Sequence, residues 1–346
     1  MNKNRFFTFF AHLGGIFLVL ASFALGGRPV QARLLADPFI PAAWPKLAGN
    51  PVLNLGDSGA WDAKNVFAPT VILDGTTYKL WYRGGSATGG GIGYATSPDG
   101  LAWTKHGSAP VLSPGAAGSW DANGASFPTV IKDGSTYKMW YTGLDASGIG
   151  RVGYATSADG ITWTKYAGNP VMGVGAAGSW DSAYVGMASV IKVGATYKLW
   201  YRGGSLTGGA IGYATSPDGL AWVKYDPAIT GGSGGWDTTP YQPDVLFDGM
   251  GYHMWYSGCN QAGDVCQEGY ATSPDGAQWT RKGMVLPQGA AGAWDDESAD
   301  HAAVVQVGST LKMWYSGDHE DHYRICYAST TASILNQHIF LPLVKR

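Results

Sequence analysis

Short apolar runs, separated by turns that contain glycine, recur along most of the chain. Between residues 120 and 163, the runs 127–131 and 137–141 are of strand length, rich in aromatic and β-branched residues, and joined by Asp133-Gly134. A third run, residues 153–157, ends at another Asp-Gly turn just before Trp163. This alternation of apolar runs and tight turns predicts four short antiparallel strands.

A Trp-Asp pair precedes each copy of this pattern. The pairs begin at Trp61, Trp120, Trp180, Trp236 and Trp294, with a spacing of about 56 to 60 residues. We call the stretches that follow these pairs repeats 1 to 5. Four-stranded units with such a period are typical of β-propeller blades. The sequence therefore predicts an all-β, five-bladed β-propeller with four antiparallel strands per blade.

The segment before the first Trp-Asp pair resembles the end of a repeat. Residues 44–46 and 50–53 match residues 163–165 and 169–172, whereas repeat 5 has no closing Asp-Gly-x-x-Trp of its own. We therefore expect the N-terminal strand to close the last blade, which would remove an open sheet edge. The propeller is predicted to span residues 33–335, and a short tail follows at 336–346.

The first residues have the pattern of a secretory signal peptide. Lys3 and Arg5 precede a largely apolar run, residues 6–25, and the small-residue motif Val-Gln-Ala ends at Ala32. The alternative is an uncleaved membrane anchor, but His12 and two glycines interrupt the run. No other stretch approaches the roughly 20 apolar residues that a membrane span needs. The prediction is a signal peptide over residues 1–32 and a secreted, extracellular protein.

The charge of the chain limits the kinds of partner that are expected, and its cysteines allow a disulfide to be predicted. Charged residues make up 14% of the 346 positions and the net charge is −2, so a basic nucleic-acid-binding surface is not expected. The protein is expected to be a monomer. Because export permits disulfides, Cys259 and Cys266, which flank one loop, are predicted to pair. Cys326 is then left as a buried thiol, at a position that is glycine in the other repeats.

Residues present in every repeat are expected to serve the fold. The Asp of the Trp-Asp pair occurs five times, so a hydrogen bond to a turn backbone explains it better than five catalytic acids do. Function is instead expected where the repeats differ. Strand directions place the Trp-Asp loops and the loops after each Trp-Tyr pair on one face, and we look for the site there.

Unrepeated polar residues gather in repeats 4 and 5. The chain has three glutamates, and all of them lie in or beside loops of these repeats: Glu268, Glu297 and Glu320. Asp300 and His301 lie in the same region, near the last Trp-Asp loop. The cluster is equally well explained as a solvent-exposed acidic loop whose sequence has diverged from the other repeats. Clusters of polar residues can have a structural role as well as a functional one.

Two arginines and three aromatic residues complete the candidate face. Arg83 and Arg202 follow Trp-Tyr in repeats 1 and 3, where the other repeats have Thr or Ser. Phe67, Tyr184 and Tyr241 are unrepeated and expected near the central axis. Aromatic faces beside polar groups suit a sugar ring. Filling of the central channel is the competing interpretation.

Five predicted blades with Thr-Val-Ile at 129–131 and Tyr-Ala-Thr-Ser at 154–157, each run followed by an Asp-Gly turn, resemble the five-bladed glycosidase propellers. That group includes arabinanases, β-xylosidases, invertases and levansucrases, and the resemblance covers residues 44–329. It implies an Asp near the start of an inner strand as base or nucleophile and a Glu from another blade as general acid. Here the positions just before the inner-strand prolines, and their equivalents, carry no acid. One residue earlier Asp300 is the only acid, and Asp244 lies further into its strand.

The resemblance thus implies Asp300 as base or nucleophile, and His301 as a ligand of an axial calcium ion or as a hydrogen-bond partner. Glu320 and Glu297 are the candidate proton donors, because both are expected on the same face in the repeat that carries Asp300. Arg83 and Arg202 would orient hydroxyls or an acidic sugar, and Glu268 and the three aromatics would contact the ligand. The predicted function is a secreted propeller that binds an oligo- or polysaccharide, with glycoside hydrolysis left open. The alternative is a non-catalytic extracellular interaction scaffold.

Overall fold

The computed structural model describes residues 44–86, 89–205, 208–232, 235–263 and 265–331. The predicted signal peptide, residues 1–32, and the tail, residues 336–346, lie outside these ranges. The described residues form twenty β-strands and no helix. None of them therefore belongs to a helix long and apolar enough to cross a membrane.

Each repeat folds into consecutive antiparallel strands. Repeat 1 contains β1 (Asn65–Asp74), β2 (Thr77–Ser86), β3 (Gly89–Ser97) and β4 (Thr104–Lys105). Repeat 2 contains β5 (Gly124–Asp133), β6 (Thr136–Leu144), β7 (Gly150–Ser157) and β8 (Thr164–Lys165). Repeat 3 contains β9 (Tyr184–Val193), β10 (Thr196–Ser205), β11 (Gly208–Ser216), β12 (Val223–Lys224) and β13 (Ile229–Thr230).

Repeat 4 contains β14 (Thr239–Phe247), β15 (Tyr252–Cys259), β16 (Cys266–Ser273) and β17 (Thr280–Leu286). Repeat 5 contains β18 (Ser298–Val307), β19 (Thr310–His319) and β20 (His322–Thr331). Repeats 1 and 4 form four-stranded sheets and repeat 5 a three-stranded one, while one parallel bridge, Gly150 to Tyr184, joins repeats 2 and 3 into a nine-stranded sheet.

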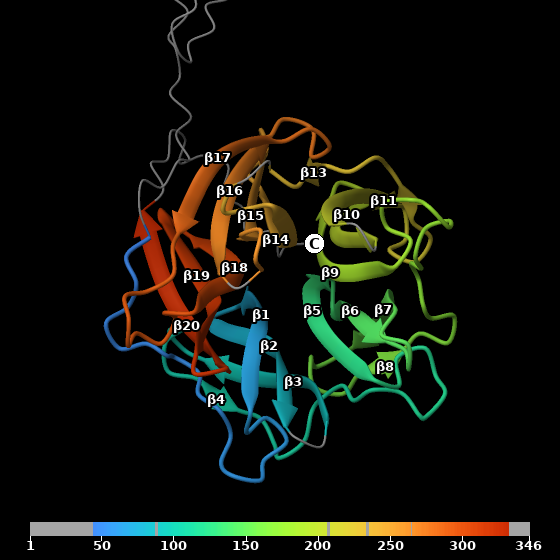
Figure 1. Ribbon diagram of the computed structural model, residues 1–346. Coiled ribbons are helices and arrows are strands. Elements are labelled where there is room, and N and C mark those ends of the chain that lie inside the picture. The colour runs from blue at the N-terminus through green and yellow to red at the C-terminus, as the bar shows by residue number, and fades with distance from the viewer. Residues whose placement is uncertain (1–43, 87–88, 206–207, 233–234, 264, 332–346) are drawn as a thin grey trace, which may run out of the picture. The chain divides into compact units, whose positions relative to one another are not determined.

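The first strand of every repeat lies toward the middle of the arrangement (Figure 1). Along the ring, β1 contacts β5, β5 contacts β9, β9 contacts β14, β14 contacts β18, and β18 contacts β1. The hydrophobic core is divided between neighbouring repeats: Trp81 of repeat 1 packs with Val130 and Met139 of repeat 2 in one cluster. Each fully buried side chain of this size stabilises the fold by roughly 1.5–3 kcal/mol.

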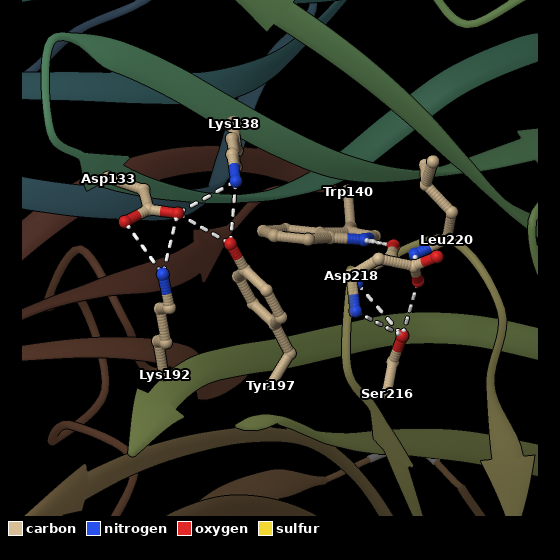
Figure 2. A network of polar contacts seen from close by, with 9 residues as sticks. Asp133, Lys138, Trp140, Lys192, Tyr197, Ser216, Asp218 and Leu220 are labelled. Atoms are coloured by element: carbon tan, nitrogen blue, oxygen red, sulfur yellow. Dashed lines mark hydrogen bonds and ion pairs between the residues drawn. The ribbon is translucent and has the colours of Figure 1, made fainter. Parts of the chain in front are cut away.

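A tryptophan on the second strand joins four pairs of neighbouring repeats. The Trp140 indole N–H donates to the carbonyl of Gly219 in the next repeat at 2.8 Å, as Figure 2 shows. Gly219 has a φ of +80°, and a Cβ there would lie 2.7 Å from the indole, so glycine is required. The same bond links Trp81 to Gly160, Trp200 to Gly276 and Trp314 to Gly100.

The N-terminal segment pairs with the last strand, as the sequence predicted. Isolated antiparallel bridges join Lys46 to Ala328 and Leu53 to Ile325. Trp44 packs edge-on against Trp255 of repeat 4, with 6.0 Å between ring centroids. The first described residues therefore lie along the outer side of β20.

The Trp-Asp carboxylates are structural, but their side-chain partners differ from the turn backbone that we expected. Asp62 Oδ2 accepts hydrogen bonds from the Tyr82 hydroxyl at 2.9 Å and from Lys105 at 2.7 Å. The corresponding carboxylates contact one tyrosine and one cation in the same way: Asp121 with Tyr141 and Lys165, Asp181 with Tyr201 and Lys224, Asp237 with Tyr256 and Arg281, and Asp295 with Tyr315 and Lys46.

A second polar network joins repeats 2 and 3 at the Asp-Gly end of the strands. Asp133 accepts hydrogen bonds from Lys138 at 2.7 Å and from Tyr197 at 2.5 Å, and Lys192 lies 2.9 Å from its other oxygen, as Figure 2 shows. The bonds from Lys138 and Tyr197 hold the pKa of Asp133 far below its ordinary value, although burial opposes them. The ionised carboxylate thus links the strands of repeat 2 to those of repeat 3.

The cysteine prediction is confirmed. Cys259 and Cys266 form a disulfide across the β15–β16 hairpin. Cys326 is a free, buried thiol on β20, and burial raises its pKa to about 12. It is therefore neutral, and it packs with the core between repeats 4 and 5.

Candidate functional site

Each central strand is interrupted at the same place by a residue with left-handed backbone geometry. At this point the strand register shifts, and the non-glycine residues there have φ values from 42° to 53°: Ala68, Phe127, Met187, Gln242 and His301. Such backbone is costly for a residue with a Cβ, and it clusters at functional sites. The central strands are therefore a candidate location for a functional site.

Asp300 and His301 form a dyad at this point of repeat 5. The Asp300 side chain is buried, with 1% of its surface exposed, and both of its oxygens are engaged. Tyr241 donates its hydroxyl to Oδ2 at 2.8 Å, and His301 Nδ1 lies 2.6 Å from Oδ1. Because a carboxylate only accepts, Nδ1 carries the hydrogen. Nε2 of His301 has no hydrogen-bond partner in the described part of the chain.

Aromatic rings surround the His301 imidazole. The Phe127 ring stacks on it at 5.7 Å, and Tyr241 contacts it edge-on at 5.4 Å. The Phe67 and Tyr323 rings lie at 5.8 and 6.3 Å. Two of the three aromatics expected near the axis, Phe67 and Tyr241, therefore flank the dyad, together with two that the sequence did not single out.

Glu268 is a buried acid at a position that is apolar elsewhere. On the third strand of the other repeats, the equivalent residues are Ile92, Val152, Ile211 and Ile325. Oε1 of Glu268 accepts hydrogen bonds from the Ser257 hydroxyl at 2.8 Å and from the Ala302 N–H at 3.0 Å. Oε2 is buried and has no partner among the described residues.

Burial is the largest cause that raises the pKa of Glu268 to about 8; the negative charges of Asp300 and Asp244 also raise it, whereas the hydrogen bonds from Ser257 and Ala302 oppose the shift. At neutral pH its carboxyl group is therefore mostly protonated and can act as a hydrogen-bond or proton donor. Ser257 connects Glu268 to the dyad, because its hydroxyl oxygen also accepts a hydrogen bond from the backbone N–H of His301 at 2.8 Å.

Two aspartates complete the acidic cluster. Asp244 on β14 accepts the Val304 N–H at 2.8 Å, and burial raises its pKa to about 7. Asp318 on β19 has a pKa raised to about 6, by burial and then by the charges of Glu297 and Asp300. Its Oδ1 is buried, with no partner in the ranges that the structure describes.

The sequence held a signal for both of these residues. The positions equivalent to Asp244 carry Thr129 and Ser189, whose hydroxyls accept the same backbone bond. The positions equivalent to Asp318 carry glycine, leucine or cysteine. An acid that replaces small or hydroxyl residues in a repeat was therefore visible in the alignment of the repeats.

Glu320 and Glu297 are exposed and do not share the burial of this cluster. Glu320 and Asp321 form the tip of the β19–β20 hairpin with φ values of +56° and +58°, as in a tight two-residue turn. The Glu320 side chain is 82% exposed. Glu297 is also exposed, and it accepts the Asp321 N–H at 3.3 Å, which ties the hairpin down. Neither has the burial expected of a proton donor with a raised pKa.

The two arginines have different surroundings. The guanidinium of Arg202 lies 5.8 Å from the centre of the Tyr184 ring and 5.6 Å from that of Tyr241, distances at which a cation is attracted to an aromatic face. Tyr241 thus connects Arg202 to Asp300. Arg83 pairs with Phe67 across β1 and β2, and burial alone lowers its pKa.

The residues around His301 do not form a calcium cage. Calcium prefers six to eight oxygen ligands. Among the described residues no group of three or more His, Cys, Asp or Glu side chains is placed to hold a metal ion. His301 offers one ring nitrogen, and both oxygens of Asp300 are engaged in hydrogen bonds. The axial ion therefore remains a prediction from resemblance, and no step is assigned to it.

Two surface grooves lie away from this centre. One, of about 670 Å³, is lined in part by Trp61, Asp62, Tyr82 and Lys105 of repeat 1. The other, of about 390 Å³, is lined in part by Trp120 and Arg151 of repeat 2. The four residues named for the first groove recur in other repeats, whereas Arg151 of the second belongs to an unrepeated loop and pairs with Asp145.

Solved structures of glycoside hydrolases and of a phosphorylase are similar to this chain in fold. A glycosyl hydrolase from Bacteroides ovatus matches with a TM-score of 0.72 and 18% identity over 85% of this chain and 95% of its own. A GH130-family structure matches with a TM-score of 0.69 and 19% identity, over 87% of this chain and 97% of its own. It comes from work on glycoside hydrolases that target β-1,2-mannosidic linkages in Candida mannan. A β-1,2-mannobiose phosphorylase from Listeria innocua matches with a TM-score of 0.67 and 15% identity, over 83% of this chain and 96% of its own.

At these identities the likeness concerns the fold, and the narrower resemblance to arabinanases and invertases is not confirmed. No protein-family model matches the chain. The uncharacterized proteins Rv1502 and MT1551 of two Mycobacterium tuberculosis strains are each 30% identical over 226 residues, covering 60% of this chain and 72% of theirs. The chain belongs to the same family as these proteins.

Proposed function

We propose that this protein is a secreted five-bladed propeller that binds carbohydrate at the centre of one face and cleaves glycosidic bonds there. The five central strands that contact one another in ring order support the blade count. The Lys46–Asp295 ion pair supports closure through the N-terminal segment. Secretion rests on the signal-peptide pattern of residues 1–32.

The observation that carries this proposal is the burial of Glu268 beside Asp300. An acid with a pKa of about 8 next to a second carboxylate is the combination that glycoside cleavage requires, because one group must donate a proton while the other stays charged. The sequence favoured Glu320 or Glu297 as the donor. The burial of Glu268 makes it the better candidate.

We assign the role of base to the Asp300–His301 dyad. Asp300 is fully occupied by Tyr241 and His301, so we assign it to orienting the imidazole. Nε2 of His301 is the base that takes a proton from water as the water oxygen bonds to the anomeric carbon, and Glu268 gives its proton to the leaving oxygen as the glycosidic C–O bond breaks. The surrounding rings of Phe67, Phe127 and Tyr323 offer apolar faces for a sugar ring.

A non-catalytic scaffold is the second candidate, and one observation favours it. Asp300 and Glu268 are 1% and 0% exposed, and their hydrogen bonds are those of a structural network that fixes repeat 4 against repeat 5. In that case the central face would bind a partner or a glycan without turnover.

A glycan screen separates the two. The full chain would be incubated with plant and microbial polysaccharides, including β-1,2-mannosides because similar structures act on them, with and without inorganic phosphate. Release of reducing ends or sugar phosphates, together with calorimetric binding, is expected for at least one glycan. Binding without turnover supports the scaffold. The absence of both binding and turnover with every glycan would contradict a carbohydrate function and leave only a scaffold for another kind of partner.

A further inference from the structure

Arg83 is a charged side chain that has lost the structural role of its position. In repeats 2, 4 and 5, the residue after Trp-Tyr is Thr142, Ser257 or Ser316, and its hydroxyl accepts the backbone N–H of the left-handed residue in the next repeat. A guanidinium group has five donors and no acceptor. Arg83 therefore cannot accept this backbone N–H.

The guanidinium of Arg83 also lacks a counter-charge. Arg83 is partly buried, its Nη1 is buried with no hydrogen-bond partner, and no carboxylate in the described ranges forms an ion pair with it. Arginine stays charged in proteins, and removing a charge from water without a partner is unfavourable. Such a group is stabilised when an anion binds to it.

The glycine-rich stretch after Arg83 lies against this side chain. A Cβ at Gly90 would lie 1.7 Å from Nη1 of Arg83 and 2.3 Å from the Gly84 carbonyl oxygen, so both the guanidinium and the backbone require glycine at position 90. Repeat 3 has the identical run Tyr-Lys-Leu-Trp-Tyr-Arg-Gly-Gly-Ser at residues 197–205, and Gly-Gly follows two residues later in both repeats. The arginine and the glycines therefore occur together as one unit.

Arg202, the counterpart in repeat 3, is already engaged. Its guanidinium lies between the Tyr184 and Tyr241 rings, whereas no aromatic ring lies within cation–π distance of Arg83 in the described part of the chain. A Cβ at Gly209 would stay 3.7 Å from Arg202. Arg202 therefore holds Tyr241 against Asp300, and Arg83 is the arginine left for a ligand.

We propose that Arg83 binds a carboxylate of the saccharide, so that the ligand of the central face is a uronic-acid-containing glycan. Arg83 lies opposite Phe67 across β1 and β2, and Phe67 contacts His301, so the carboxylate is recognised beside the sugar that reaches the dyad. Planar guanidinium groups suit carboxylates because two parallel hydrogen bonds can form. This inference rests on the proposal that the face binds carbohydrate.

Calorimetry on the full chain tests it, with oligosaccharides of galacturonate, glucuronate and mannuronate, each compared with its carboxyl-reduced neutral form. At least one uronide is expected to bind about tenfold or more tightly than its neutral form. Arg83→Gln should weaken that uronide by about 10- to 100-fold, as expected for a lost charged hydrogen bond, and leave the neutral form unchanged. Arg151→Gln, whose arginine is paired with Asp145, should change neither by more than twofold.

Arg83→Lys keeps the charge and should retain part of the preference for the uronide, which separates ligand recognition from a folding defect. Equal binding of acidic and neutral forms, or a preference that survives Arg83→Gln, overturns this inference and leaves the proposed function standing. Binding of inorganic phosphate or sulfate without any uronide overturns the carboxylate assignment. Absence of all saccharide binding overturns both proposals.

Discussion

Lys46 lies 2.6 Å from Asp295, with Nζ of the lysine against Oδ2 of the aspartate, and this ion pair joins the N-terminal segment to the Trp-Asp loop of repeat 5. In repeats 1 to 4 the equivalent cation comes from the repeat itself, as Lys105 does for Asp62. Repeat 5 is thus completed by residues from the opposite end of the described chain.

Breaking this pair should destabilise the whole fold. Lys46→Met leaves the buried Asp295 carboxylate without its cation, so we expect the free energy of unfolding to fall by about 1–3 kcal/mol, below the full cost of breaking a buried pair because Lys46 is partly exposed. Urea unfolding measures this, with Lys64→Met at an exposed site as the control. Removal of residues 33–56 should cost more. An unchanged midpoint in both variants would contradict a shared last blade.

Acid should unfold the protein partly through Asp133. Because hydrogen bonds from Lys138 and Tyr197 lower its pKa in the folded state, its contribution is complete above the ordinary pKa of about 3.9 and is lost as the pH falls below that value. Asp133→Asn should therefore destabilise the protein at pH 7 and flatten the loss of stability below pH 4. Parallel pH dependence of the two proteins would show that this carboxylate is not linked to folding.

Glu268 should have the opposite pH dependence. Its pKa in the folded state, about 8, lies above the unfolded value of about 4.3. Its contribution is therefore complete at low pH and is lost as the pH rises, by about 1.4 kcal/mol per unit between these two values. Glu268→Gln should remove this slope, because the amide oxygen can still accept the bonds from Ser257 and Ala302. Unfolding measured from pH 5 to 8 that shows the same slope in both proteins would refute the raised pKa.

The Tyr241 hydroxyl should stabilise Asp300. Tyr241→Phe keeps the ring beside His301 and removes the donor to the buried carboxylate, so a loss of about 1–3 kcal/mol in unfolding free energy is expected. Tyr225→Phe, which removes an exposed hydroxyl bonded to Thr215, is the matched control and should change stability by less than about 0.5 kcal/mol. Equal effects of the two variants would mean that Asp300 does not depend on Tyr241.

The strands could be predicted from the sequence because the same pattern of apolar runs and turns occurs in five repeats. The apolar runs at 127–131 and 137–141 lie within β5 (Gly124–Asp133) and β6 (Thr136–Leu144). The similarity of the N-terminal segment to a repeat end predicts its pairing with β20. The outer strands were harder: β8 is only the pair Thr164–Lys165, since much of that edge is irregular.

The site was only half visible. Asp300, His301, Phe67 and Tyr241 are predicted from the sequence and lie together, but the sequence predicts Glu320 or Glu297 as the proton donor, whereas we propose Glu268 because it is buried. Acidity can be read from a sequence, whereas desolvation cannot, because it depends on which side chains surround the carboxyl. Comparison of Glu268 with its apolar equivalents in the other repeats was the available clue, since a charged residue at a buried Ile or Val position needs an explanation.

Turnover by three forms of the full chain tests most directly whether Glu268 is the proton donor of a glycosidase. On the glycan that the wild type cleaves, Glu268→Gln is expected to lower kcat by about 10²- to 10⁴-fold with little change in saccharide affinity. Glu320→Gln, at the exposed hairpin tip, is expected to stay within about twofold of the wild type. Full activity of a folded Glu268→Gln variant, or loss of activity in Glu320→Gln alone, would contradict the assignment of the buried acid.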